Sequence, residues 1–198
     1  NVPDDNVRLL VDMAMQQANQ IVLPSFYYAT FNGELDESSL NCSETKTRFL
    51  LGTTIARLLH NAEFFLVFTA TAGIDYQNEH NRLSQAGDVL QLYIWDALGT
   101  CVAEATGNLM EKYIEADFKD TLHTNRFSPG YCGWPVKDQR ILFDMLPPKV
   151  CDITLNDCAL MYPIKSISGI IGLGAHVDTK KYGCQFCELT SCYKKRMK

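Results

Sequence analysis

The sequence lacks three features that would each point to a different class of protein. No apolar run approaches the roughly 20 residues that a bilayer-spanning helix needs. The first residues, Asn1 to Asp5, lack the charged and then apolar pattern of a signal peptide. The net charge of -5 leaves no basic excess to neutralise nucleic-acid phosphates over a broad surface. We therefore expect a cytoplasmic protein without a membrane or nucleic-acid partner, and the start at Asn1 rather than Met suggests a piece of a longer chain.

Two periodic segments and one apolar run dominate what the sequence does contain. Apolar residues recur every three or four positions over residues 5–21 and 88–118, which predicts two helices, the second long enough to be central to the core. Residues 64–71 are almost all apolar and predict a strand buried on both faces. The other expected elements are a strand over 47–51, helices over 53–61, 74–83 and 136–146, and strands within 153–174.

Mixed helices and strands without strict alternation predict an α+β fold. We expect a largely antiparallel, twisted sheet with the long central helix and flanking helices around it. Residues 1–46 are expected to form an N-terminal helix and an irregular connector, residues 47–178 the core, and residues 179–198 a cysteine-rich tail. The 46% apolar content of 198 residues is sufficient for one substantial core.

The segment from Arg126 to Pro135 combines a cation, three aromatic rings and several helix-breaking residues. Pro129 lacks an amide hydrogen, while Gly130 and Gly133 allow backbone angles that other residues resist. The pattern predicts a rigid turned loop that displays Arg126, Tyr131 and Trp134 and suits a small polar or cationic ligand. A tight connection between a strand and a helix, without a ligand, is the alternative.

Motifs in this loop and beyond it carry a family resemblance. The run from Arg126 to Tyr131 is followed by Leu155 to Pro163 and by Ser166 to Gly169. In that order and spacing, these runs resemble the activation domain of vitamin B12-dependent (cobalamin-dependent) methionine synthase. Residues 64–113, with Ala70-Thr71-Ala72-Gly73 closing a strand before a long helix, look like free-standing members of that family.

The resemblance implies a domain that binds S-adenosylmethionine and supports reductive activation of a corrinoid, in the pathway of methionine biosynthesis. Carried over by position, the ligand-holding residues would be Arg126, Ser128, Gly130 and Tyr131. Arg126 would pair with the ligand carboxylate and Tyr131 would offer a ring face to the sulfonium. Asp96 and Glu104 on the long helix could face the amino or sulfonium charge, although solvated or salt-bridged roles are the alternative for helical carboxylates.

Three of the eight cysteines cluster near the C-terminus. Cys184, Cys187 and Cys192 have a spacing that can converge on one soft metal, such as a structural zinc or an iron–sulfur cluster. Three unligated reduced thiols are the other alternative. The remaining five cysteines are scattered, which favours reduced thiols over a disulfide framework.

The sequence therefore predicts an accessory protein that binds S-adenosylmethionine and supports the reactivation of a corrinoid (cobalamin) protein such as methionine synthase. The implied partners are a corrinoid-binding protein or domain and a flavodoxin-like or ferredoxin-like reductant. Whether the chain is itself an enzyme stays open; if so, it is the reactivation part of a methyltransferase. Two alternatives remain: a non-enzymatic docking module, and an electron-transfer protein that uses the C-terminal cysteines.

Overall fold

The computed structural model describes residues 4–179, which form two compact units. Within these residues, the first unit contains 4–27, 69–114 and 147–168, and the second contains 28–68, 115–146 and 169–179. Cys184, Cys187 and Cys192 lie outside the described residues. None of the helices within residues 4–179 combines the length and the apolar character that crossing a membrane requires.

A four-stranded sheet has the order β1-β5-β9-β6, with β1 at Ser25–Phe31, β5 at Phe64–Thr71, β9 at Ser166–Gly174 and β6 at Leu122–His123. Strands β6 and β9 pair antiparallel. Backbone hydrogen bonds join Glu63 to Leu173 at one end of β5 and Ala72 to Lys165 at the other, so β5 and β9 also run in opposite directions. Seven of the eight residues of β5 are buried, which confirms the expected two-sided burial.

Two smaller sheets complete the strands. Strands β2 (Gly33–Leu35), β3 (Leu40–Cys42) and β4 (Arg48–Phe49) form an antiparallel meander, and β7 (Thr154–Leu155) pairs with β8 (Met161–Tyr162). The α+β fold with an antiparallel sheet is thereby confirmed. The expected irregular connector before Cys42 was wrong, because it contains β1, β2 and β3. Only Phe31 of β1 is buried, so this edge strand lacks the two-residue alternation that identifies strands in a sequence.

The five α-helices of the described residues are α1 (Asp5–Ile21), α2 (Gly52–Leu58), α3 (Ile74–Ala86), α4 (Val89–Asp117) and α5 (Gln139–Asp144). The 29-residue α4 confirms the long central helix. Helix α5 follows a short 3-10 turn, Val136–Asp138, so the expected helix over 136–146 is present in two pieces.

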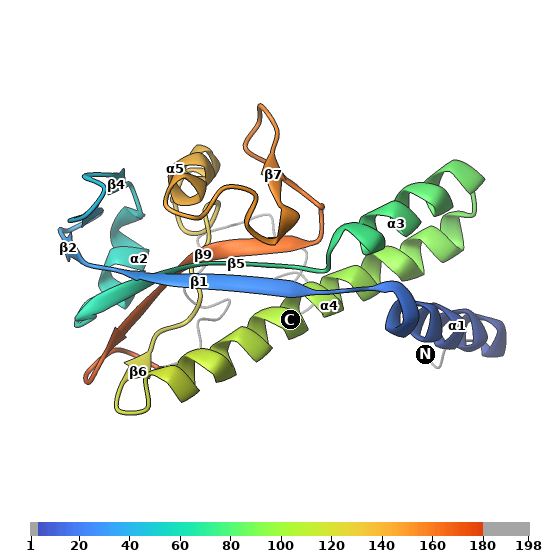
Figure 1. The fold of residues 1–198 in the computed structure, drawn as a ribbon, viewed down its shortest axis with the longest axis horizontal. Helices are drawn as coiled ribbons and strands as arrows, with labels where there is room; N and C mark the ends of the chain where they lie inside the picture. Colours follow the sequence, from blue (N-terminus) through green and yellow to red (C-terminus); the bar gives the residue numbers. More distant parts are fainter. Residues whose placement is uncertain (1–3, 180–198) are drawn as a thin grey trace. The chain divides into compact units, whose positions relative to one another are not determined.

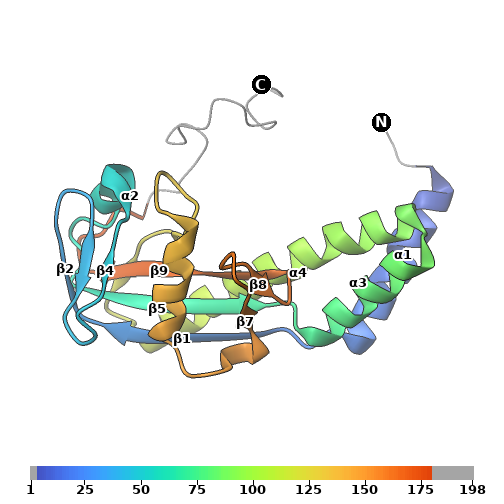
Figure 2. The same ribbon diagram turned by 90° about the horizontal axis from the view of Figure 1, so that it is seen from above.

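Helices α1 and α3 and the N-terminal part of α4 lie side by side in the first unit (Figures 1 and 2). Their core contains Ala18, Tyr76, Leu83 and Trp95, with Tyr76 and Trp95 stacked at a centroid distance of 5.5 Å. Gly99 makes this packing possible, because a Cβ at that position would overlap the phenol ring of Tyr76.

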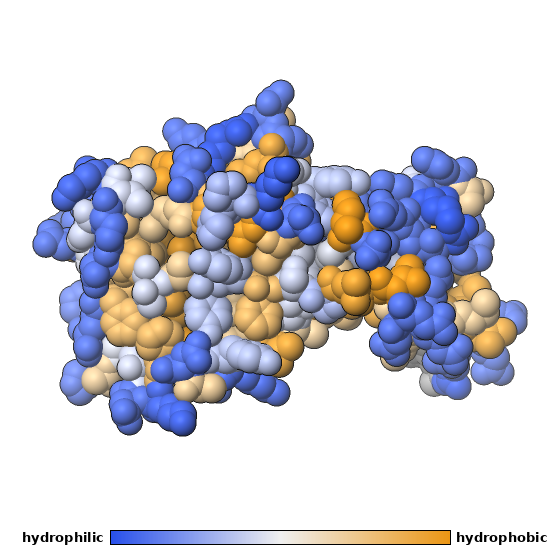
Figure 3. Space-filling model, viewed as in Figure 1, coloured by the Kyte–Doolittle hydropathy of each residue, from blue (hydrophilic) through white to orange (hydrophobic). Residues whose placement is uncertain are grey.

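Some apolar side chains of the first unit remain on the surface. Leu23 is 73% exposed, Ile74 39% and Ile164 46%. Figure 3 shows hydrophobic atoms gathered where β1 follows α1 and where α3 begins. Exposed apolar groups of this kind are often interaction surfaces, although scattered single ones are common.

Candidate functional site

The loop from Arg126 to Pro135 lies in the second unit and turns on three residues with positive φ. The φ angles are 99° at Gly130, 45° at Cys132 and 88° at Gly133. The two glycines adopt this region at little cost, as the sequence predicts. Cys132 is the unexpected member, because a side chain is disfavoured there.

Three backbone hydrogen bonds close the loop on itself. The Gly130 N–H donates to the Trp134 carbonyl at 2.7 Å, and the Trp134 N–H donates to the Tyr131 carbonyl at 2.7 Å. The Tyr131 N–H donates to the Ser128 carbonyl at 3.1 Å. These amides are therefore already used within the loop, whereas each carbonyl oxygen keeps a second lone pair. The carbonyls of Ser128, Tyr131 and Trp134 can therefore each still accept a hydrogen bond from a ligand.

Trp134 and Asp138 anchor the loop in the second unit. The expectation that the loop displays Trp134 was wrong: the residue is only 1% exposed, because its ring packs edge-on against Phe49 at 5.8 Å. Its Nε1–H donates to Asp138 Oδ2 at 3.2 Å, and the Leu50 N–H donates to the same oxygen at 3.2 Å. Asp138 is 3% exposed, so this carboxylate is a buried acceptor shared by the loop and the segment after β4.

The start of the loop is fixed by an antiparallel bridge to β9. The Phe127 N–H donates to the Ile170 carbonyl at 3.0 Å, and the Ile170 N–H donates back at 2.8 Å. The carbonyl of Phe127 lies so close to Gly169 that a Cβ there would overlap it. The glycine of the Ser166–Gly169 motif therefore has a packing role: it admits the backbone that precedes the loop.

The loop presents its two principal side chains differently. Tyr131 is 47% exposed. Arg126 is half-buried, its Nη1 atom is buried, and the residue already takes part in an interaction with the rest of the protein. Ser128 is half-buried and Gly130 is exposed. The phenol is thus more accessible than the Arg126 and Ser128 side chains of the same loop.

Asp96 and Glu104 lie on α4 in the first unit, whereas the loop belongs to the second. Lys165 Nζ forms an ion pair with Asp96 Oδ1 at 2.8 Å and donates to Thr100 Oγ1 at 3.0 Å. Burial raises the pKa of Tyr76, and the negative charge of Asp96 raises it further. The carboxylate of Asp96 is thus paired with Lys165. Glu104 is exposed and takes part in an interaction with the rest of the protein.

The cysteines of the described residues form no metal centre. Within residues 4–179, no three His, Cys, Asp or Glu side chains converge in a way that could hold a metal ion. Cys42, Cys101, Cys132, Cys151 and Cys158 are free thiols, and burial raises the pKa of Cys151. The predicted ligands Cys184, Cys187 and Cys192 lie outside these residues, so their metal site stays a prediction.

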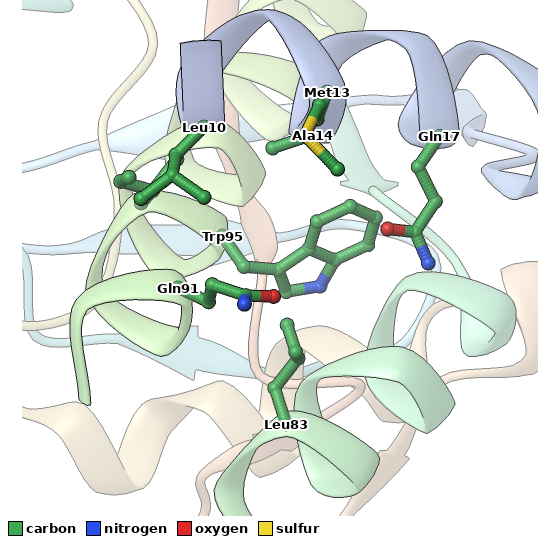
Figure 4. A pocket seen from close by; sticks show the side chains of 8 residues that line it. Leu10, Met13, Ala14, Gln17, Leu83, Gln91 and Trp95 are labelled. Carbon is green, nitrogen blue, oxygen red and sulfur yellow. The ribbon is translucent and has the colours of Figure 1, made fainter. Parts of the chain in front are cut away.

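Sequence reasoning missed a cavity of about 50 Å³ in the first unit. Residues from α1, α3 and α4 line it, including Gln17, Leu83, Gln91 and Trp95 (Figure 4). No local motif could have revealed it, because its walls come from three helices far apart in sequence. Its volume is well below that of a nucleoside.

Comparisons with known proteins identify the family to which this α+β fold and its loop belong. The family described as vitamin B12 dependent methionine synthase, activation domain, matches residues 42–197, and the chain belongs to this family. The match contains the loop and both following motifs, and it supports a role in cobalamin reactivation. It also implies interaction with a cobalamin-binding domain.

One solved structure extends the likeness to the whole fold. A crystal structure of the MetH reactivation domain bound to AdoHcy superposes with a TM-score of 0.63 at 16% sequence identity. The alignment covers 91% of this chain and 70% of that one. At this identity the likeness shows a shared fold. A search of the curated proteins gave no match.

Proposed function

We propose that this chain binds S-adenosylmethionine at the loop from Arg126 to Tyr131 and supports the reductive methylation of a corrinoid carried by a partner. The observation that carries the proposal is the family match over residues 42–197, which includes this loop. When bound, S-adenosylmethionine supplies the methyl group that the reduced corrinoid takes, and a flavodoxin-like or ferredoxin-like reductant would supply the electron.

The groups of the loop fit the polar parts of this ligand. Arg126 offers a guanidinium to the carboxylate, and the exposed ring of Tyr131 offers a π face to the sulfonium, a contact worth about 0.5 to 2 kcal/mol. The carbonyls of Ser128 and Tyr131 can accept hydrogen bonds from the adenine amino group or the ammonium. The internal hydrogen bonds of the loop hold these acceptors in place before the ligand arrives.

Asp96 and Glu104 enter the proposal as carboxylates that favour a cationic ligand. Lys165 already neutralises part of the charge of Asp96. Substituting Lys165→Met should therefore strengthen ligand binding if Asp96 faces the ligand, and should leave it unchanged if Asp96 has only a structural role. Glu104→Gln should weaken ligand binding if Asp96 and Glu104 both face the ligand.

Titration calorimetry with S-adenosylmethionine tests the site directly. We expect Arg126→Ala to abolish binding while the fold survives, and Tyr131→Ala to weaken it by about 2- to 30-fold. Tyr131→Phe should bind almost normally, because the ring is retained. Tyr93→Ala, which removes a 72% exposed tyrosine of α4, is the matched control and should bind like the unsubstituted protein.

An absence of heat with the unsubstituted protein would refute S-adenosylmethionine binding. If the same protein then still captured a cobalamin-loaded binding domain, its role would be that of a docking module. For the C-terminal cysteines we propose zinc or an iron–sulfur cluster, and metal analysis with an absorption spectrum after anaerobic purification tests this. A colourless, metal-free protein would end that part of the proposal.

A further inference from the structure

The cavity among α1, α3 and α4 combines apolar walls with two amide groups (Figure 4). Leu10 and Leu83 contribute aliphatic surface and Trp95 contributes its indole. The indole is held firmly, because its Nε1–H donates to the Tyr76 carbonyl at 3.2 Å and its ring stacks on the Tyr76 ring. The cavity therefore has a fixed aromatic wall.

Two carboxylates orient the amides of Gln17 and Gln91. Gln17 Nε2 donates to Glu79 Oε1 at 2.8 Å, and Gln91 Nε2 donates to Asp88 Oδ2 at 2.9 Å. A carboxylate only accepts hydrogen bonds, so each amide must direct its NH₂ group to the carboxylate and leave its oxygen elsewhere. In Figure 4 both amide oxygens are turned toward the indole of Trp95. Within residues 4–179, neither oxygen accepts a hydrogen bond from the protein; Gln17 is half-buried and Gln91 is exposed, so the cavity opens to solvent on the Gln91 side.

The charges behind these amides favour a positive ligand. Glu79 is 8% exposed and is paired with Arg82 at 2.6 Å, which lowers the pKa of the Glu79 carboxyl. Asp88 adds a second carboxylate, which is exposed and screened by water, so Glu79 and Asp88 together exceed Arg82 by one negative charge. The two amide oxygens and this negative charge would repel an anion. They would attract a cation, and so would the aromatic ring of Trp95.

We propose that this cavity binds a small primary alkylammonium ion, with the ammonium between the oxygens of Gln17 and Gln91 and the alkyl group against Leu10 and Leu83. The volume of about 50 Å³ admits a head of only a few heavy atoms. For a ligand of three heavy atoms, such as ethylammonium, we expect a dissociation constant on the order of 1 mM. The site belongs to the first unit and does not depend on the proposed nucleoside site.

Nuclear magnetic resonance of the two tryptophan indoles tests the proposal in the intact chain. The sequence has only Trp95 and Trp134, so one signal reports the cavity and the other, from the second unit, serves as an internal control. Ethylammonium chloride should shift the Trp95 signal with saturation and leave that of Trp134 unchanged. Ethanol and sodium acetate, of similar size and at matched ionic strength, should produce no saturable shift.

Two variants separate a cation site from a cavity that merely holds water. Gln91→Met keeps the length of the side chain but removes the acceptor, and should weaken ethylammonium binding about 10-fold or more. Ala14→Leu fills part of the cavity from α1 and should abolish binding. The proposal is overturned if ethylammonium gives no saturable shift, if ethanol shifts Trp95 equally, or if folded Gln91→Met protein binds undiminished.

Discussion

Asp138 offers the sharpest test of how the loop from Arg126 to Pro135 is held in place. Its Oδ2 accepts hydrogen bonds from Trp134 Nε1 and from the Leu50 N–H, both at 3.2 Å, and the residue is 3% exposed. Replacing it by alanine removes the acceptor of two donors, the buried indole N–H of Trp134 and the part-buried N–H of Leu50, a residue that is 47% exposed. The loop then loses the bond that fixes its buried tryptophan.

The expected cost follows from counting the orphaned donors. A buried donor left without a partner costs about 1 to 3 kcal/mol and the part-buried Leu50 N–H costs less, so Asp138→Ala should destabilise the fold by about 1 to 4 kcal/mol. Asp138→Asn retains an oxygen in nearly the same place. It should cost roughly half as much, because neutral hydrogen bonds are about half as strong as those to a charged acceptor.

Urea denaturation followed by tryptophan fluorescence measures both costs. Calorimetry with S-adenosylmethionine then shows whether loss of the Trp134 hydrogen bond also weakens ligand binding by the loop. Asp144→Ala, at an exposed acidic residue of α5, controls for loss of one negative charge. The reasoning is refuted if Asp138→Ala lies within about 0.5 kcal/mol of the unsubstituted protein, a change typical of neutral surface substitutions.

Two further predictions concern stability. Gly99→Ala should destabilise the protein by about 1 to 3 kcal/mol despite the better helix propensity of alanine, because the added Cβ overlaps the ring of Tyr76; thermal melts check this, and an unchanged melting temperature would contradict it. Hydrogen bonds, led by that from the Ser39 hydroxyl, lower the pKa of Asp36 to about 2 from its ordinary 3.8. Asp36 therefore stabilises the fold above about pH 4 and loses that contribution as the pH falls toward 2, so Asp36→Asn should show its largest deficit near neutrality and converge with the parent in acid. A deficit that grows in acid would contradict the sign.

Local patterns in the sequence predicted the strongest elements correctly. The period of three to four residues gave α1 and α4 with nearly their observed bounds, and the apolar run gave β5 at Phe64–Thr71. These elements have one face or both faces buried in a regular way, so their burial pattern is visible in the sequence. Strands β1 and β6 were missed, because one has mostly half-buried or exposed residues and the other has only two residues.

The candidate site was only partly accessible to sequence reasoning. The motif identified the loop and its turning glycines, since both depend on neighbours within ten residues. The internal use of three loop amides, the anchor at Asp138 and the salt bridge between Asp96 and Lys165 depend on geometry or on residues distant in the chain.

The sequence by itself determined the family, the α+β class and the position of the loop from Arg126 to Pro135, because motifs and periodicity are properties of consecutive residues. Only the tertiary structure decided which acceptor holds Trp134, where the carbonyls of the loop stay available, and that a cavity forms among α1, α3 and α4. Such features arise when segments dozens of residues apart pack against one another, and packing of this kind leaves no regular spacing in the chain.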